Sequence, residues 1–184
     1  MATGATIVRD ARPEDADGIA RVHVATWQGA YAHIFPPEAL RALDAGMERR
    51  GAYWRQTIET AGPQAHTLVA VLDDDVVGFA DVRPTRDVDA DAERVGELTA
   101  IYVSPAAWGV GAGRRLMTDA LERLRGSGFE EATLWVLEDN PRARRFYEIA
   151  GWRADGSAKE DEFLGTRVRE VRYRIELSTG ISSG

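Results

Sequence analysis

Three glycines that alternate along the chain are the residues with the clearest chemical potential. Gly109, Gly111 and Gly113 follow a β-branched, apolar run at residues 99–103 and open an amphipathic run that continues from Arg114. The pattern predicts a strand, a glycine turn and a helix. The first turn of such a helix presents unpaired backbone N–H groups and a partial positive charge. A phosphate or pyrophosphate can bind there, so a phosphate-bearing ligand is the first functional hypothesis.

The glycine spacing alone does not identify that ligand. A Walker loop ends in Gly-Lys-Ser/Thr, whereas Arg114 and Arg115 follow the glycines here. A dinucleotide fingerprint has an acidic residue about 20 positions further on that ends a second strand. Glu130 and Glu131 lie near that distance, but they begin the next strand-like run. A tight turn that binds nothing also fits this motif taken alone.

A second motif, nearer the C-terminus, predicts a short and well-delimited helix. Asn140 is a preferred N-cap residue, Pro141 stands at the first helical position, and Gly151 lies just past the expected end. The helix carries the pair Phe146 and Tyr147. A helix and a strand fill the space between this motif and the glycine loop.

Together and in this order, the two motifs resemble the GNAT superfamily of acetyl-CoA-dependent N-acetyltransferases. The resemblance extends from Ile7 to about Leu177. It implies that the strand before the glycine loop pairs with the pantetheine arm of acetyl-CoA, that the loop amides hold the pyrophosphate, and that Asn140 contacts the cofactor. The implied cofactor-binding residues are Ile101, Tyr102, Val103, Trp108, Gly109, Val110, Gly111, Ala112, Gly113, Arg114 and Asn140.

Trp108 departs from the family pattern, which usually has Gln or Arg at this position. The change removes one polar contact to the cofactor but leaves the backbone amides of the loop in place. We therefore expect it to be tolerated.

The resemblance also implies which groups perform the reaction, in which an amine attacks the thioester directly. This step needs a deprotonated amine, a donor for the oxyanion and an acid for the thiolate. Tyr147 would lie near the sulfur, and its ordinary pKa of about 10 suits proton transfer to a thiolate. Glu97 falls where histone-acetylating members carry their general base, and it could act directly or through a water. A backbone N–H within residues 101–103 would meet the oxyanion.

Each of these assignments has a structural alternative. Tyr147 could simply pack beside Phe146, since aromatic pairs on a helix are often core residues. Glu97 could be a solvated carboxylate at a strand end. A non-catalytic CoA-binding sensor is the alternative to an enzyme, and the intact Tyr147 argues against it. A module that binds NAD or ATP is a third class, which the expected N-terminal helices and early hairpin disfavour.

The elements that must position these residues can be read along the chain. An Asp-rich turn at residues 73–75 predicts a hairpin, and Gly126 to Gly128 ends the helix that follows the glycine loop. The resemblance and this pattern predict an α/β fold with a mixed, mostly antiparallel central sheet of six to seven strands flanked by helices. The expected strands are residues 5–9, 67–72, 76–83, 97–103, 132–137 and 167–177, and the expected helices begin near residues 13, 30, 112 and 141.

The acceptor pocket is expected in the N-terminal third of the chain. Residues 30–61 are helical in pattern, with interruptions at residues 36–37 and at Gly46. In GNAT proteins this region usually builds the acceptor pocket, so Tyr31 and Phe35, together with Trp27 on the preceding helix, are the candidates for substrate contact. The resemblance implies that the acceptor is a primary amine of a small molecule, an amino acid or a peptide, and the sequence does not distinguish them.

Composition limits the remaining possibilities. The 184 residues suit a single domain, with a structured core at 5–177 and a mobile tail at 178–184. No cysteine is present, so an acyl-cysteine intermediate and thiolate zinc ligation are excluded. His23, His33 and His66 lack the spacing of metal ligands, and we expect no metal.

Charge and hydropathy address partners and location. The net charge of −7 disfavours a nucleic-acid partner and is compatible with a cationic amine substrate. No apolar run approaches the roughly 20 residues of a membrane span, so we expect no membrane partner and a cytoplasmic protein. Family members are often homodimers, although nothing in this sequence requires one.

Overall fold

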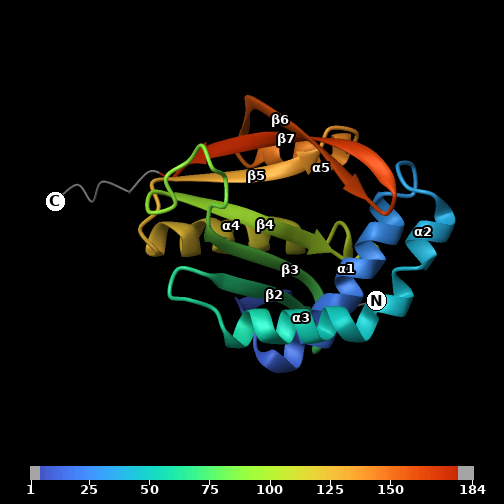
Figure 1. Ribbon diagram of the computed structural model, residues 1–184. Coiled ribbons are helices and arrows are strands. Elements are labelled where there is room, and N and C mark those ends of the chain that lie inside the picture. Colours follow the sequence, from blue (N-terminus) through green and yellow to red (C-terminus); the bar gives the residue numbers. More distant parts are fainter. Residues whose placement is uncertain (1–4, 178–184) are drawn as a thin grey trace.

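Seven strands form one sheet in the computed structural model, which describes residues 5–177 (Figure 1). The strands lie in the order β1-β2-β3-β4-β5-β7-β6, and all neighbours are antiparallel except β4 and β5. The predicted mixed, mostly antiparallel sheet is therefore confirmed. The tail predicted at 178–184 lies outside the described residues. The strands are β1 (Ile7–Asp10), β2 (His66–Leu72), β3 (Asp75–Pro84), β4 (Val95–Val103), β5 (Glu131–Leu137), β6 (Arg153–Phe163) and β7 (Thr166–Glu176).

Helices cover both faces of the sheet (Figure 1). On one face, α1 and α3 bring Ile19 and Trp54 against Phe79 of β3. On the other face, α4 brings Leu116 against the neighbouring Ala80, as strand alternation requires. The helices are α1 (Ala16–Ala30), α2 (Pro37–Arg41), α3 (Met47–Glu59), α4 (Ala112–Gly126) and α5 (Pro141–Ile149), with short 3₁₀ turns η1 (Pro13–Asp15), η2 (Asp44–Gly46) and η3 (Pro105–Ala107).

The hairpin expected from the Asp-rich turn joins β2 to β3. Asp73 and Asp74 have φ values of 50° and 68°, the left-handed conformation that tight hairpin turns need. Aspartate adopts this conformation more readily than most residues because its short polar side chain bonds to the local backbone. The turn therefore directs β3 back along β2 into the centre of the sheet.

The strand β6 was not predicted from the sequence. It pairs with β7 from Arg153 opposite Arg174 to Phe163 opposite Thr166, around a tight turn at Leu164 and Gly165. Most of its side chains are exposed, so it lacks the alternation of apolar and polar residues that identifies a half-buried strand. Backbone hydrogen bonds to β7 hold β6 in place. Such pairing cannot be predicted from a pattern of side chains.

The two central parallel strands stay together over only a short distance. β4 and β5 pair at Val95–Glu131, Gly96–Ala132 and Glu97–Thr133, and then they part. β4 nevertheless remains paired with β3 as far as Val103. The backbone groups along one edge of β4 are thus left without a strand partner in the middle of the sheet.

His23, on α1, packs against the sheet as a partly buried, neutral side chain. Its ring stacks on Tyr102 at 5.2 Å between centroids and lies 6.2 Å from the ring of Phe79. Burial lowers the pKa of His23 to about 4, and the charge of nearby Arg50 acts in the same direction. Between pH 6.5 and about 4, His23 is therefore protonated in the unfolded chain, where its pKa is about 6.5, but stays neutral in the folded protein.

This difference predicts a pH dependence of stability. As pH falls from 6.5 to about 4, the unfolded chain takes up a proton at His23 before the folded protein does, so the stability present above pH 6.5 is lost in this window. In urea titrations at pH 7 and pH 4, we expect the wild type to lose about 2–3 kcal/mol more unfolding free energy than His23→Gln. Equal losses in the two proteins would contradict the burial of a neutral His23.

Candidate active site

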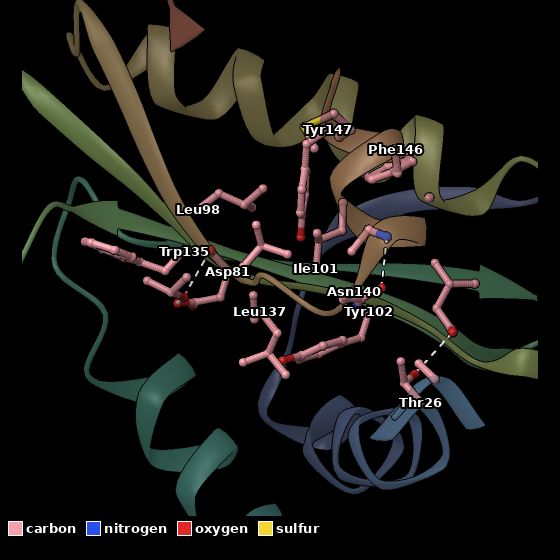
Figure 2. A pocket seen from close by; sticks show the side chains of 18 of the residues that line it. Thr26, Asp81, Leu98, Ile101, Tyr102, Trp135, Leu137, Asn140, Phe146 and Tyr147 are labelled. Carbon is pink, nitrogen blue, oxygen red and sulfur yellow. Dashed lines mark hydrogen bonds between the residues drawn. The ribbon is translucent and has the colours of Figure 1, made fainter. Parts of the chain in front are cut away.

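A cavity of about 1200 Å³ extends along the divergence of β4 and β5 (Figure 2). The glycine loop and α5 line one end, and α1 with the β6–β7 hairpin lines the other. The cavity thus brings together parts of the chain that are far apart in sequence. It joins both motifs singled out in the sequence with the aromatic residues of the N-terminal region.

The free edge of β4 faces this cavity. The N–H of Ser104 donates to the carbonyl of Val77 on β3, so the backbone groups of Tyr102 also face β3. Those of Ile101 and Val103, which alternate with them, point toward the side where β5 has diverged. An extended ligand with amide groups could pair with this edge as an added strand.

A bulge in β4 lies beside the point of divergence. Ala100 pairs with Asp81 and Leu98 pairs with Val82, so Thr99 is an extra residue in the ladder. The hydroxyl of Thr99 donates to the carboxylate of Asp81, which is buried and also accepts a hydrogen bond from Thr67 at 2.9 Å. Arg83 completes this set with an ion pair to Asp81 at 2.7 Å. The bulge is therefore fixed by a fully partnered carboxylate.

The glycine loop connects β4 to α4, as predicted. Gly109 and Gly111 have φ values of 88° and 85°, which other residues adopt only with strain. Gly111 is the N-cap of α4 and offers no side-chain cap, so the first amides of the helix are free to bind an anion. Most of the predicted loop residues line the cavity, whereas Val110 projects outward and does not.

Trp108 makes contacts that the sequence did not reveal. Its indole N–H donates to the carbonyl oxygen of Val103 at 2.8 Å. The guanidinium of Arg142, at the start of α5, lies 3.5 Å from the centroid of the Trp108 ring. The loop is thereby connected both to the end of β4 and to α5.

Tyr147 and Asn140 come from α5 and its N-cap. Tyr147 is buried among aromatic rings, and its hydroxyl points into the cavity beside Ile101 (Figure 2). Burial, with a smaller contribution from the Tyr102 phenol, raises the pKa of Tyr147, so its hydroxyl stays protonated at neutral pH. Asn140 lines the cavity and accepts a hydrogen bond from the N–H of Ala143 at 3.0 Å, as an N-cap does.

Glu97 lies at the cavity wall in a close pair with Arg86. Its carboxylate is buried and accepts from Nη2 of Arg86 at 2.8 Å, from Nε at 3.2 Å and from the Arg86 backbone N–H at 3.2 Å. A carboxylate has about four acceptor positions. One position on Oε1 therefore remains for a water or a substrate.

Of the three predicted acceptor residues, two reach the cavity. Trp27 and Tyr31 line it, and their rings meet edge to face at 5.1 Å. Phe35 is buried behind them, stacked on Trp27 at 5.6 Å, and does not line the cavity. Within residues 5–177, Nε1 of Trp27 and Nδ1 of His23 are the buried side-chain atoms that lack a hydrogen-bond partner. These groups give the acceptor side an aromatic and weakly polar wall.

Arg172 fixes the acidic loop between β3 and β4 at the cavity. It is buried in β7 and pairs with Asp87 at 3.1 Å, Asp89 at 2.7 Å and Asp155 at 2.7 Å. Asp87 also accepts from the indole N–H of Trp135 at 2.9 Å. No sequence signal marked Arg172, because its partners lie in two other segments.

From its sequence, the chain is expected to hold no metal and to have no membrane partner. Over residues 5–177, no group of three or more His, Asp or Glu side chains is arranged to hold a metal ion. In the same part of the chain, no helix has both the length and the apolar character that a bilayer span requires.

Comparison with known proteins gives concordant matches. A sequence model of the acetyltransferase (GNAT) family matches residues 27–152. YuaI, an uncharacterized N-acetyltransferase of Bacillus subtilis, is 32% identical over 168 residues, which are 89% of each chain. The mycothiol acetyltransferase of Sanguibacter keddieii is 41% identical over 46% of this chain, which spans only 27% of that protein.

Solved structures with the same fold include two ligand complexes. PaiA N-acetyltransferase of Thermoplasma acidophilum, solved with coenzyme A, superposes with a TM-score of 0.73 at 19% identity and covers 93% of this chain and 98% of its own. YncA of Salmonella typhimurium, solved with its cofactor acetyl-CoA, superposes with a TM-score of 0.72 at 20% identity. The match covers 97% of this chain and 98% of YncA.

Proposed function

The chain belongs to the acetyltransferase (GNAT) family and is an acyltransferase, and on this premise we propose that it transfers the acetyl group of acetyl-CoA to a primary amine by direct attack. One observation carries the proposal: β4 parts from β5 and leaves a free backbone edge that ends at a glycine loop and a helix N-terminus. An arm that contains amide groups and ends in a pyrophosphate matches this arrangement. The relatives solved with coenzyme A or acetyl-CoA support it through their shared fold.

The residues present fit the pantetheine arm and the pyrophosphate of the cofactor. The backbone groups of Ile101 and Val103 would pair with the pantetheine arm, flanked by Tyr102. The amides from Trp108 to Arg114 would hold the pyrophosphate at the start of α4, where Gly111 leaves the helix without a side-chain cap. Asn140 would contact the cofactor from the opposite wall. Acetyl-CoA supplies the acetyl group as an activated thioester.

Tyr147 is proposed as the acid that protonates the departing thiolate. Its hydroxyl points into the cavity beside the free edge of β4 (Figure 2), and its raised pKa keeps the proton in place until a strong base develops nearby. A thiolate that forms as the C–S bond breaks is such a base. A backbone N–H within residues 101–103 would stabilise the oxyanion.

Glu97 is proposed to take the proton from the attacking ammonium group. The remaining acceptor position on Oε1 lies on a carboxylate that Arg86 already holds by three hydrogen bonds. A single water on this position would connect Glu97 to the amine. Arg86 then positions the carboxylate, while Tyr147 acts from the other side of the reacting group.

The acceptor is proposed to bind against Trp27 and Tyr31, in front of Phe35. The aromatic wall suits an amine presented on a small molecule, an amino acid or a peptide. This chain spans only 27% of the mycothiol acetyltransferase of Sanguibacter keddieii and 42% of that of Frankia casuarinae, so these partial matches do not select among the acceptors.

Replacing Tyr147 with Phe tests the catalytic proposal. We expect kcat for thiol release from acetyl-CoA, measured with a panel of primary amines, to fall by about 10²- to 10⁴-fold. Affinity for acetyl-CoA should change little, because the ring remains. Tyr173→Phe is the matched control, since Tyr173 is a buried phenol on β7 that donates to Glu148 at 3.0 Å and does not line the cavity. A kcat that Tyr147→Phe leaves unchanged would remove Tyr147 from the mechanism.

Replacing Gly111 with Val tests the proposed pyrophosphate site. The φ of 85° makes any side chain strained there, and a distorted loop would misplace the amides. We expect the dissociation constant for CoA, measured by calorimetry, to rise at least about tenfold, since charge-assisted hydrogen bonds would be lost. Gly128→Val is the control, because Gly128 has a φ of 89° at the far end of α4 and lies outside the cavity. Equal CoA affinities in the two variants would place the pyrophosphate elsewhere.

A further inference from the structure

The carbonyl oxygen of Val103 already accepts two hydrogen bonds from side chains. The indole N–H of Trp108 donates to it at 2.8 Å. The hydroxyl of Thr26, which is labelled in Figure 2, donates to it at 3.1 Å. A carbonyl oxygen has two lone pairs. Both are in use although this oxygen faces the side of β4 from which β5 has departed.

This oxygen lies on the edge to which the proposed function assigns the pantetheine arm, and the inference rests on that function. A ligand amide that pairs with Val103 would bring a third donor to the oxygen. One of the two present donors must then leave. The two donors are not equivalent, because they differ in burial and in the backbone that carries them.

Thr26 is the donor that we expect to stay. It is buried on α1, a helix of 15 residues that packs against the sheet and α3. Trp108 is only partly buried, and it precedes a loop in which Gly109 and Gly111 both adopt left-handed backbone conformations. Glycines on that side allow the backbone to move at low cost. We therefore expect the more exposed donor of the pair, the indole, to leave the carbonyl in preference to the buried threonine.

Arg142 links the ring of Trp108 to helix α5. Its guanidinium lies 3.5 Å from the centroid of the Trp108 ring, so a cation–π contact joins the glycine loop to the first turn of α5. Among the described residues Arg142 forms no ion pair, and its side chain is exposed. Its charge is thus available to an anionic ligand as soon as the ring moves.

We propose that Trp108 is the gate of the cofactor slot: its indole N–H occupies the Val103 carbonyl, Arg142 holds the ring in place, and both contacts break when CoA pairs with β4. Trp108 thereby lowers the affinity for CoA and slows the association of CoA. A polar residue at this position would instead contact the pyrophosphate. The gate is a positioning device and takes no part in acetyl transfer.

The test is CoA binding to Trp108→Phe, which keeps an aromatic face for Arg142 but has no N–H. Because the competing hydrogen bond is absent, we expect the dissociation constant for CoA to fall by about three- to tenfold, the range that one net hydrogen bond represents. The association rate in stopped-flow experiments should rise by a similar factor. Arg142→Lys keeps the charge but loses the planar stack, and it should also raise the association rate.

Trp152→Phe serves as the matched control. Trp152 is fully buried in the core, outside the cavity, and its N–H faces the sulfur of Met117 at 3.4 Å. Its replacement should lower stability and leave the CoA dissociation constant unchanged. If the wild type binds CoA at least as tightly as Trp108→Phe does, the proposed gate is wrong, while the proposed function is not affected. Absence of CoA binding in the wild type and in all variants would overturn the proposed function and the gate together.

Discussion

The parting of β4 from β5 after three paired residues is the constraint on which the site depends. Backbone N–H and C=O groups in the interior of a sheet are normally paired, and leaving them unpaired costs free energy. At Val103 this cost is met in part by side chains, since two of them donate to its carbonyl. An extended ligand that pairs with this edge can recover the rest of this free-energy cost.

The surrounding elements hold the strands apart and place functional groups along the opening. At the closed end, Gly96 pairs with Ala132, and a Cβ at Gly96 would lie 2.4 Å from Leu124, so α4 packs directly on the backbone there. At the open end, the glycine loop and α5 supply free amides and Tyr147. On the acceptor side, Arg172 holds the acidic loop against the cavity. Packing at both ends of the opening thus determines the geometry of the site.

Local patterns predicted the parts of this structure that local physics determines. The Asp73–Asp74 turn, the glycine loop and the Asn140 cap each depend on a few adjacent residues with distinctive backbone preferences. The strand β6, the divergence of the sheet and the contact of Trp108 with Val103 were not predictable in this way. Each arises from pairing between distant segments or from a strand whose side chains are mostly exposed, and neither leaves a periodic signal in the sequence.

The most direct test of the central claim is amide hydrogen exchange at the edge of β4, measured by NMR with and without CoA. If the ligand pairs with this edge, exchange at Ile101 and Val103 should slow by at least about tenfold on binding, since their N–H groups gain partners. Tyr102 is the internal reference, because its N–H faces β3 and is protected in both states. Unchanged exchange at Ile101 and Val103 in a protein saturated with CoA would contradict the account.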